Sequence, residues 1–165
     1  MLKITRFKEN LFLKIYSWWK IPLIGFCSPK IIECSLQKTI IKIPLKYQTK
    51  NHLGAMYFGS LAIGAELSIA MLAVKLIKAH TDAGGDRIDF IFKDFKANFL
   101  KRADGDVHFI CEEAKIVSDQ IDQAKISTDR INKTLIAYAV VPKNSETEKI
   151  ATFELTLSVK RRLKK

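Results

Sequence analysis

The sequence is poor in glycine, proline and cysteine, and these shortages exclude several classes of protein. Seven Gly and four Pro among 165 residues exclude collagen-like and Pro/Gly-rich low-complexity chains. The cysteines Cys27, Cys34 and Cys111 are odd in number and form no C-x-x-C pair, so neither a disulfide framework nor a zinc ribbon is predicted. The three histidines form no H-x-x-x-H pattern, and we expect no metal site. This cysteine usage fits a reduced, cytoplasmic compartment.

Acidic residues are scarce at the two ends of the chain. Residues 1–50 hold ten basic and two acidic residues, and residues 160–165 hold five basic and no acidic ones. The middle, 51–159, is nearly neutral, although the whole chain carries a net charge of +11. Basic ends on a neutral body do not predict a nucleic-acid binder. They fit a solvated basic tail, or attraction to a phosphate-bearing cofactor, an acidic carrier protein or an anionic membrane.

The body is rich enough in apolar residues (48%) to form one compact domain. Residues 1–28 form a basic segment before it and predict an amphipathic helix that Pro22 ends or kinks. The apolar stripe of this helix comprises Phe7, Leu11, Ile15, Trp18 and Trp19. We expect this stripe to pack against the domain. An interfacial membrane helix over residues 1–26 is the alternative.

The most apolar stretch is 53–74, in which Glu66 is the one ionisable residue. Its length suits a transmembrane helix, but a midplane carboxylate costs about 2.5–3.5 kcal/mol, and the stretch is rich in small residues. We therefore predict a helix buried in a soluble domain, with a membrane anchor as the alternative. Ser60, Gly64 and Ser68 form a shallow stripe on this helix that suits packing on a sheet. Glu66 projects roughly opposite, towards a cleft or a subunit interface.

The rest of the chain predicts strands and one short helix. The alternation of apolar and polar residues changes phase within 30–45, which indicates one bulged strand there. It changes phase again near Lys93–Asp94, which indicates a second bulge. Ser118 is expected to cap a helix that runs to about Arg130. Further strands are expected over residues 88–100, 107–117, 135–142 and 151–160. Antiparallel strands that cover one apolar helix, an α+β domain, are the most economical architecture.

Two motifs resemble those of a known family. Asn51, Gly54, Gly59 and Glu66 fall on the register of the signature of hotdog-fold acyl-CoA thioesterases of the phenylacetate-pathway type. The block 98–106 is similar to the strand and turn of that family. The resemblance implies a hotdog fold over 29–162, followed by a basic tail at 163–165. It also implies a dimer, or a dimer of dimers, with active sites between subunits.

The sequence departs from the signature at Tyr57 and Phe58, which stand where the family has His-Gly. The resemblance implies that a backbone N–H of Phe58 or Gly59 stabilises the oxyanion, since a main-chain donor survives a change of side chain. A buried Glu66 can act as general base on water, as nucleophile, or as a structural carboxylate. Tyr57 either replaces the histidine as a hydrogen-bond donor or lines a pocket or the core.

Asn51 and the basic pair Lys101 and Arg102 each allow two interpretations. Asn51 orients the water or substrate, or holds the turn before the helix. Lys101 and Arg102 meet coenzyme A phosphates, or lie in a solvated turn, and Gly54 belongs to the substrate-binding loop.

The predicted function is hydrolysis of an acyl-CoA or acyl-carrier-protein thioester, with no cofactor beyond the coenzyme A of the substrate. A non-catalytic acyl- or lipid-binding module is the alternative. We expect no nucleic-acid partner.

Overall fold

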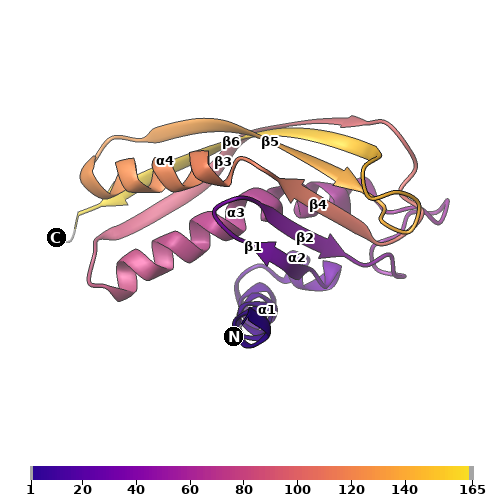
Figure 1. Ribbon diagram of the computed structural model, residues 1–165, viewed down its shortest axis with the longest axis horizontal. Coiled ribbons are helices and arrows are strands. Elements are labelled where there is room, and N and C mark those ends of the chain that lie inside the picture. The colour runs from indigo at the N-terminus through magenta and orange to yellow at the C-terminus, as the bar shows by residue number, and fades with distance from the viewer. Residues whose placement is uncertain (1, 164–165) are drawn as a thin grey trace.

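The structure is a computed structural model that describes residues 2–163. Its elements follow one another along the chain (Figure 1) as α1 (Leu2–Lys20), α2 (Pro22–Cys27), β1 (Lys30–Cys34), β2 (Thr39–Ile43), α3 (Phe58–Asp82), β3 (Arg87–Phe99), β4 (Val107–Cys111), α4 (Ala114–Ile126), β5 (Ile131–Val140) and β6 (Lys149–Arg162). Lys164 and Lys165, in the predicted basic tail, lie outside the described residues.

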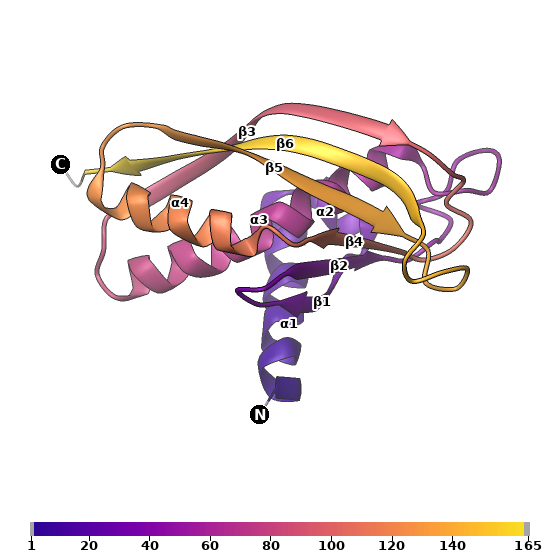
Figure 2. The same ribbon diagram turned by 45° about the horizontal axis from the view of Figure 1, so that its top comes forward.

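All six strands form one antiparallel sheet in the order β1-β2-β4-β5-β6-β3. The sheet curves over α3, which lies along its concave side (Figures 1 and 2). The predicted α+β architecture, a curved sheet around a long central helix, is confirmed. The predicted bulge in β3 is also confirmed, because the pairing with β6 shifts register between Phe92 and Phe95.

The central helix α3 is buried because its residues are small or apolar on most sides. An added Cβ at Gly64 would lie 2.2 Å from the ring of Phe109 on β4, so a glycine is needed where helix and sheet approach. By length and composition alone α3 could cross a membrane, but 61% of its most apolar window is buried inside the protein. This burial favours a core helix over the membrane anchor.

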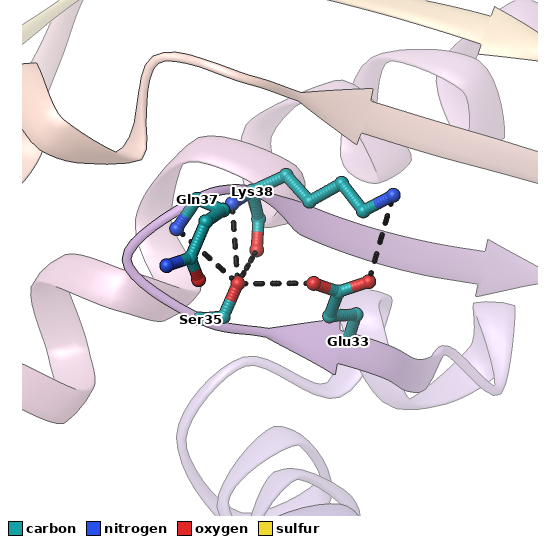
Figure 3. A network of polar contacts seen from close by, with 4 residues as sticks. All are labelled: Glu33, Ser35, Gln37 and Lys38. Carbon is teal, nitrogen blue, oxygen red and sulfur yellow. Dashed lines mark hydrogen bonds and ion pairs between the residues drawn. The ribbon is translucent and has the colours of Figure 1, made fainter.

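The predicted single strand over 30–45 is wrong, since β1 and β2 are separate strands of a hairpin. Ser35 makes the turn without glycine or proline (Figure 3). Its hydroxyl accepts hydrogen bonds from the N–H groups of Gln37 (3.3 Å) and Lys38 (3.2 Å) and donates one to Glu33 (3.0 Å). The apparent change of phase therefore marks the turn rather than a bulge.

The predicted boundaries of the short helix are wrong at both ends. The helix α4 begins at Ala114, so Ser118 lies inside it, and its N-cap residue Glu113 makes no side-chain cap bond. The helix begins nearer the N-terminus than predicted because its buried residues follow helical spacing from Ala114 onwards. They are Ala114, Val117, Gln120, Ile121 and Ala124. The buried Gln120 donates to the carbonyl oxygens of Leu157 (2.8 Å) and Ile131 (3.0 Å) and so anchors α4 to the sheet.

At the N-terminus, Pro22 separates two helices as predicted, since α1 ends at Lys20 and Pro22 begins α2. Asn10 fixes α1 to the outer edge of β1. Its side chain accepts a hydrogen bond from the N–H of Ile31 (2.8 Å) and donates one to the carbonyl of Ile31 (3.0 Å). Glu9 adds an ion pair with Lys75 of α3 (2.8 Å).

The predicted packing of the α1 apolar stripe against the domain is wrong. Leu13 and Ser17 are the buried residues of α1, and the hydroxyl of Ser17 donates to the carbonyl of Leu13 (2.6 Å). The helix therefore docks through Asn10, Leu13 and Ser17, where short side chains allow close approach. The five stripe residues remain between 46% and 78% exposed: Phe7, Leu11, Ile15, Trp18 and Trp19.

Candidate active site

A cleft of about 590 Å³ is enclosed by α1 and α2 on one side and by α3 and β3 on the other. Its walls are mostly apolar. They include Phe12 and Tyr16 from α1, Ile63 and Met71 from α3, and Phe92 from β3. A volume of this size suits an organic ligand with an extended apolar part.

Glu66 projects from α3 into the wall of this cleft. The side chain is half-buried and makes no hydrogen bond or ion pair with any other residue in the described part of the chain. Burial raises the pKa of its carboxyl group above the ordinary value of 4.5, because a low-dielectric environment disfavours the charged form. The position matches the prediction that Glu66 faces a cleft opposite the Ser60/Gly64/Ser68 stripe, whose Gly64 contacts the sheet.

Other predicted site residues gather around a second depression, of about 370 Å³, at the N-terminal end of α3. The N–H of Met56 donates to the carbonyl of Ala103 (2.8 Å) and holds the loop before α3 against the loop after β3. The depression is lined by Asn51, Phe58, Lys101 and Arg102, among others, but not by Glu66. The residues that the sequence places in one site are therefore divided between two cavities, and Gly54, Tyr57 and Gly59 line neither of them.

Asn51 uses its side chain within its own turn. The amide oxygen accepts hydrogen bonds from the N–H groups of Leu53 (2.9 Å) and Ala55 (3.2 Å). Gly54, in the same turn, has a φ of +79°, a conformation that glycine adopts without strain. Asn51 therefore holds the turn before α3, which is the second of its two predicted roles. The turn forms part of the wall of the second depression.

Tyr57 and Phe58 stand side by side at the start of α3, with ring centroids 4.8 Å apart. Both side chains are exposed. Tyr57 is the N-cap residue but makes no side-chain cap bond, so within the described residues it gives the first-turn N–H groups of Phe58 and Gly59 no capping acceptor. A helix N-terminus with free donors favours negative charge.

The two basic residues of the second depression are already partnered. Lys101 forms an ion pair with Glu148, and Arg102 donates to the carbonyl of Leu53. Both remain exposed, so their charge is available to an anion in the solvent beside them.

None of the cysteines has the environment of a nucleophile. Burial raises the pKa of Cys27 and Cys34, and it raises that of Cys111 to about 11, so the thiol forms dominate at neutral pH. Over residues 2–163 there is no group of three or more His, Cys, Asp or Glu side chains placed to hold a metal ion.

Sequence reasoning missed the part of the site that α1 builds. Phe12 and Tyr16 lie on the flank of the predicted apolar stripe, and they line the cleft with Glu66. Two aromatic side chains beside the stripe could have indicated that α1 lines a pocket. Which way they point depends on the face through which α1 docks, and the sequence does not show that face.

Known proteins resemble this chain in structure rather than in sequence. No family model matches the chain, and no curated protein matches its sequence. A protein of unknown function from Pseudomonas aeruginosa, described as a probable thioesterase, is 17% identical, with 92% of this chain and 95% of that one covered and a TM-score of 0.71. A thioesterase from Haemophilus influenzae is 14% identical, with 91% and 90% covered and a TM-score of 0.63.

A third similar structure is a thioesterase family protein from Silicibacter pomeroyi. It is 16% identical, with 93% of this chain and 99% of that one covered and a TM-score of 0.64. The resemblance found in the sequence is thus confirmed at the level of the fold, and the chain has the hotdog fold.

Proposed function

We propose that the protein hydrolyses acyl thioesters, with acyl-CoA or an acyl-carrier protein as the substrate. The observation that carries this proposal is Glu66, a carboxylate without a partner in the wall of an apolar cleft. An unpaired, half-buried carboxylate is costly to the fold, so its place favours a role in chemistry over a structural one. The hotdog thioesterases of similar structure support the same class of reaction.

The raised pKa makes Glu66 a stronger base than an exposed glutamate. In the proposed reaction its carboxylate takes a proton from water while the water oxygen bonds to the thioester carbonyl carbon. Collapse of the tetrahedral intermediate breaks the C–S bond. The proton passes to the leaving sulfur, and the products are a carboxylic acid and a thiol.

The proposed oxyanion donors are the N–H groups of Phe58 and Gly59. Glu66 lies seven residues beyond Gly59 on the same helix, which places it about 10 Å further along the axis. Glu66 and Phe58 also line separate cavities of the protein. The proposal therefore combines Glu66 of one copy with the α3 N-terminus of a second copy.

The edge strand β3 supports such a homodimer. It is 13 residues long and, within residues 2–163, pairs with β6 alone, so one side offers unpaired backbone groups to a second copy. Phe95 and Phe99 of this strand contact the ring of the buried Phe153 yet remain exposed. A second copy against β3 would cover them.

Lys101 and Arg102 are the proposed contacts for the phosphates of coenzyme A, beside the depression that holds Phe58. In this arrangement the acyl chain occupies the cleft with Glu66 and the nucleotide lies outside. Coenzyme A is part of the substrate, and the proposed reaction uses no further cofactor.

The second candidate is an acyl-binding module without turnover. The aromatic pair Tyr57 and Phe58 favours it, because two rings at the start of α3 crowd the place from which the oxyanion donors point. It predicts binding of the same ligands with no release of thiol.

The test is thiol release from acyl-CoAs with short, medium, long and aromatic acyl groups. Glu66→Gln keeps the shape and removes the base, so we expect kcat to fall by about 10²–10⁴-fold. Glu154→Gln, which alters an exposed glutamate paired with Lys96, is the matched control and should keep wild-type rates. Equal rates in Glu66→Gln and wild type would exclude the proposed mechanism. Ligand binding with no turnover in the wild type would favour the binding module.

A further inference from the structure

The exposed side of α1 carries an apolar surface, interrupted near its N-terminal end by the exposed Lys8. We define the apolar face as Phe7, Leu11, Ile15, Trp18 and Trp19, which fall within about 120° of one another around the helix. Phe7 is 69% exposed and Trp19 is 78% exposed. Figure 2 shows α1 extending away from the sheet past β1. An apolar surface of this extent on a small protein is typical of an interaction site.

A basic groove adjoins the apolar face. This groove, of about 580 Å³, lies between α1 and the segment that links α2 to β1. Its lining includes Arg6, Lys14, Lys30 and Lys46 and no acidic residue. Phe7 and Trp18 also line it, so the groove is continuous with the apolar face.

The positive charge of this region is not neutralised within the protein. Glu9 is the one acidic residue among residues 1–30, and it is paired with Lys75 of α3. Arg6, Lys14 and Lys30 are exposed and form no ion pair within residues 2–163. These charges are therefore available to an anionic partner.

We propose that α1 and the basic groove dock the protein on the surface of an anionic phospholipid bilayer. The apolar face inserts among the acyl chains at the level where tryptophan is favoured, while the groove takes the phosphate-bearing headgroups. The exposed lysines on the flanks keep their charged ends in the headgroup layer.

Other occupants fit this surface less well. A second copy docked through the same face would bring two sets of unpaired cations together with no carboxylate between them. A nucleic acid would meet the positive charge but leave the apolar face in water. An anionic bilayer satisfies both the apolar surface and the charge.

Docking would also bring the Glu66 cleft close to the bilayer. Phe12 and Tyr16, on the flank of α1, line that cleft. The docking itself does not depend on the proposed hydrolysis, since it is measured in the absence of any thioester.

The experiment is flotation of the full chain with vesicles of phosphatidylcholine alone or of equimolar phosphatidylcholine and phosphatidylglycerol. We expect binding to the anionic vesicles that weakens at high salt. Phe7→Ser with Trp19→Ser should lower the partition coefficient about tenfold or more. Ile126→Ser with Ile136→Ser, two residues 83% and 53% exposed on other elements, is the matched control and should bind as the wild type does.

The charge is tested separately. Lys14→Gln with Lys30→Gln should lower the partition coefficient about tenfold. Lys133→Gln with Lys143→Gln changes the net charge equally at exposed positions elsewhere and should have little effect. Both tryptophans of the chain, Trp18 and Trp19, lie on the apolar face, so their fluorescence should shift to the blue and be quenched by brominated lipid on binding.

Three results would overturn the proposal. The first is no binding of the wild type to anionic vesicles. The second is equal loss of binding in the test and control variants. The third is a wild-type dimer in solution that Phe7→Ser with Trp19→Ser converts to a monomer, which would assign the apolar face to self-association.

Discussion

At the scale of single residues, Glu66 is the side chain whose environment is hardest to explain by folding alone. It interrupts an apolar helix and faces a cleft rather than a counter-charge. The carboxyl group is therefore held in a place where its proton is retained to a higher pH than in the unfolded chain. A catalytic base can use this property, but protein stability suffers from it.

We predict that Glu66→Gln stabilises the protein at neutral and alkaline pH. Because the pKa of Glu66 is higher in the folded than in the unfolded state, the folded protein binds more protons between the two values. The wild type therefore loses stability as pH rises through that window. Glutamine does not ionise and escapes this loss.

Thermal unfolding of both proteins between about pH 4 and pH 8 measures the effect. We expect a higher Tm for Glu66→Gln at the alkaline end and converging values at the acid end. A difference in Tm that does not change with pH would show that the carboxyl group is not desolvated.

At the scale of secondary-structure elements, the close approach of α3 and the sheet rests on Gly64. Alanine favours a helix over glycine by about 1 kcal/mol, so propensity alone predicts stabilisation by Gly64→Ala. The ring of Phe109 leaves no room for the added methyl group, and we expect the steric effect to dominate.

We predict that Gly64→Ala lowers the free energy of unfolding by about 1–3 kcal/mol. Phe109→Leu alone should also destabilise, since it removes part of a fully buried ring. In the double variant the smaller side chain accommodates the methyl group, so the total loss should be less than the sum of the two. Urea unfolding of the four proteins measures this coupling. If the losses of the two single variants simply add in the double variant, the added methyl group does not clash with Phe109.

The sequence indicated the central helix because its apolar run is long and holds one ionisable residue, and it indicated the long strands because apolar and polar residues alternate along them. It did not indicate the β1–β2 turn, since Ser35 makes that turn with its hydroxyl rather than with glycine or proline. The docked face of α1 was missed for a similar reason. Asn10 docks through hydrogen bonds to Ile31, and the buried Ser17 satisfies its hydroxyl within α1, whereas hydrophobic periodicity marks only the apolar side.

The candidate site was predictable only in part. Glu66 was singled out as a lone carboxylate in an apolar helix, and its direction followed from helix geometry. The separation of Glu66 from Asn51, Lys101 and Arg102 was not foreseen. It depends on α1 and β3, which close one cleft around Glu66 and leave the loops to form another.

At the scale of the whole molecule, the layers are unequal: the sheet covers one side of α3, and the N-terminal helices cover part of the other (Figure 2). The concave side is left open along β3. The exposed rings of Phe95 and Phe99 lie there, and the proposed dimer would close the gap.

We predict that the protein is a dimer in solution and that Phe99→Asp shifts it towards the monomer. A buried carboxylate opposite its own copy is costly, and repulsion adds to that cost. Light scattering coupled to size exclusion measures the mass. Ile136→Asp, at a site of similar exposure on β5 (53% against 50% for Phe99), is the control and should leave the mass unchanged. A monomeric wild type would contradict the proposed two-copy site.

The side chain of Asn10 has a consequence for the ends of the sheet. Its amide bonds to both the N–H and the carbonyl of Ile31, as the peptide group of a neighbouring strand would, so the β1 edge is blunted while the β3 edge stays free. Growth of the sheet by adding copies can then proceed in one direction only. Two copies joined through β3 present blunted edges at both ends, and the assembly stops there instead of continuing into a fibre.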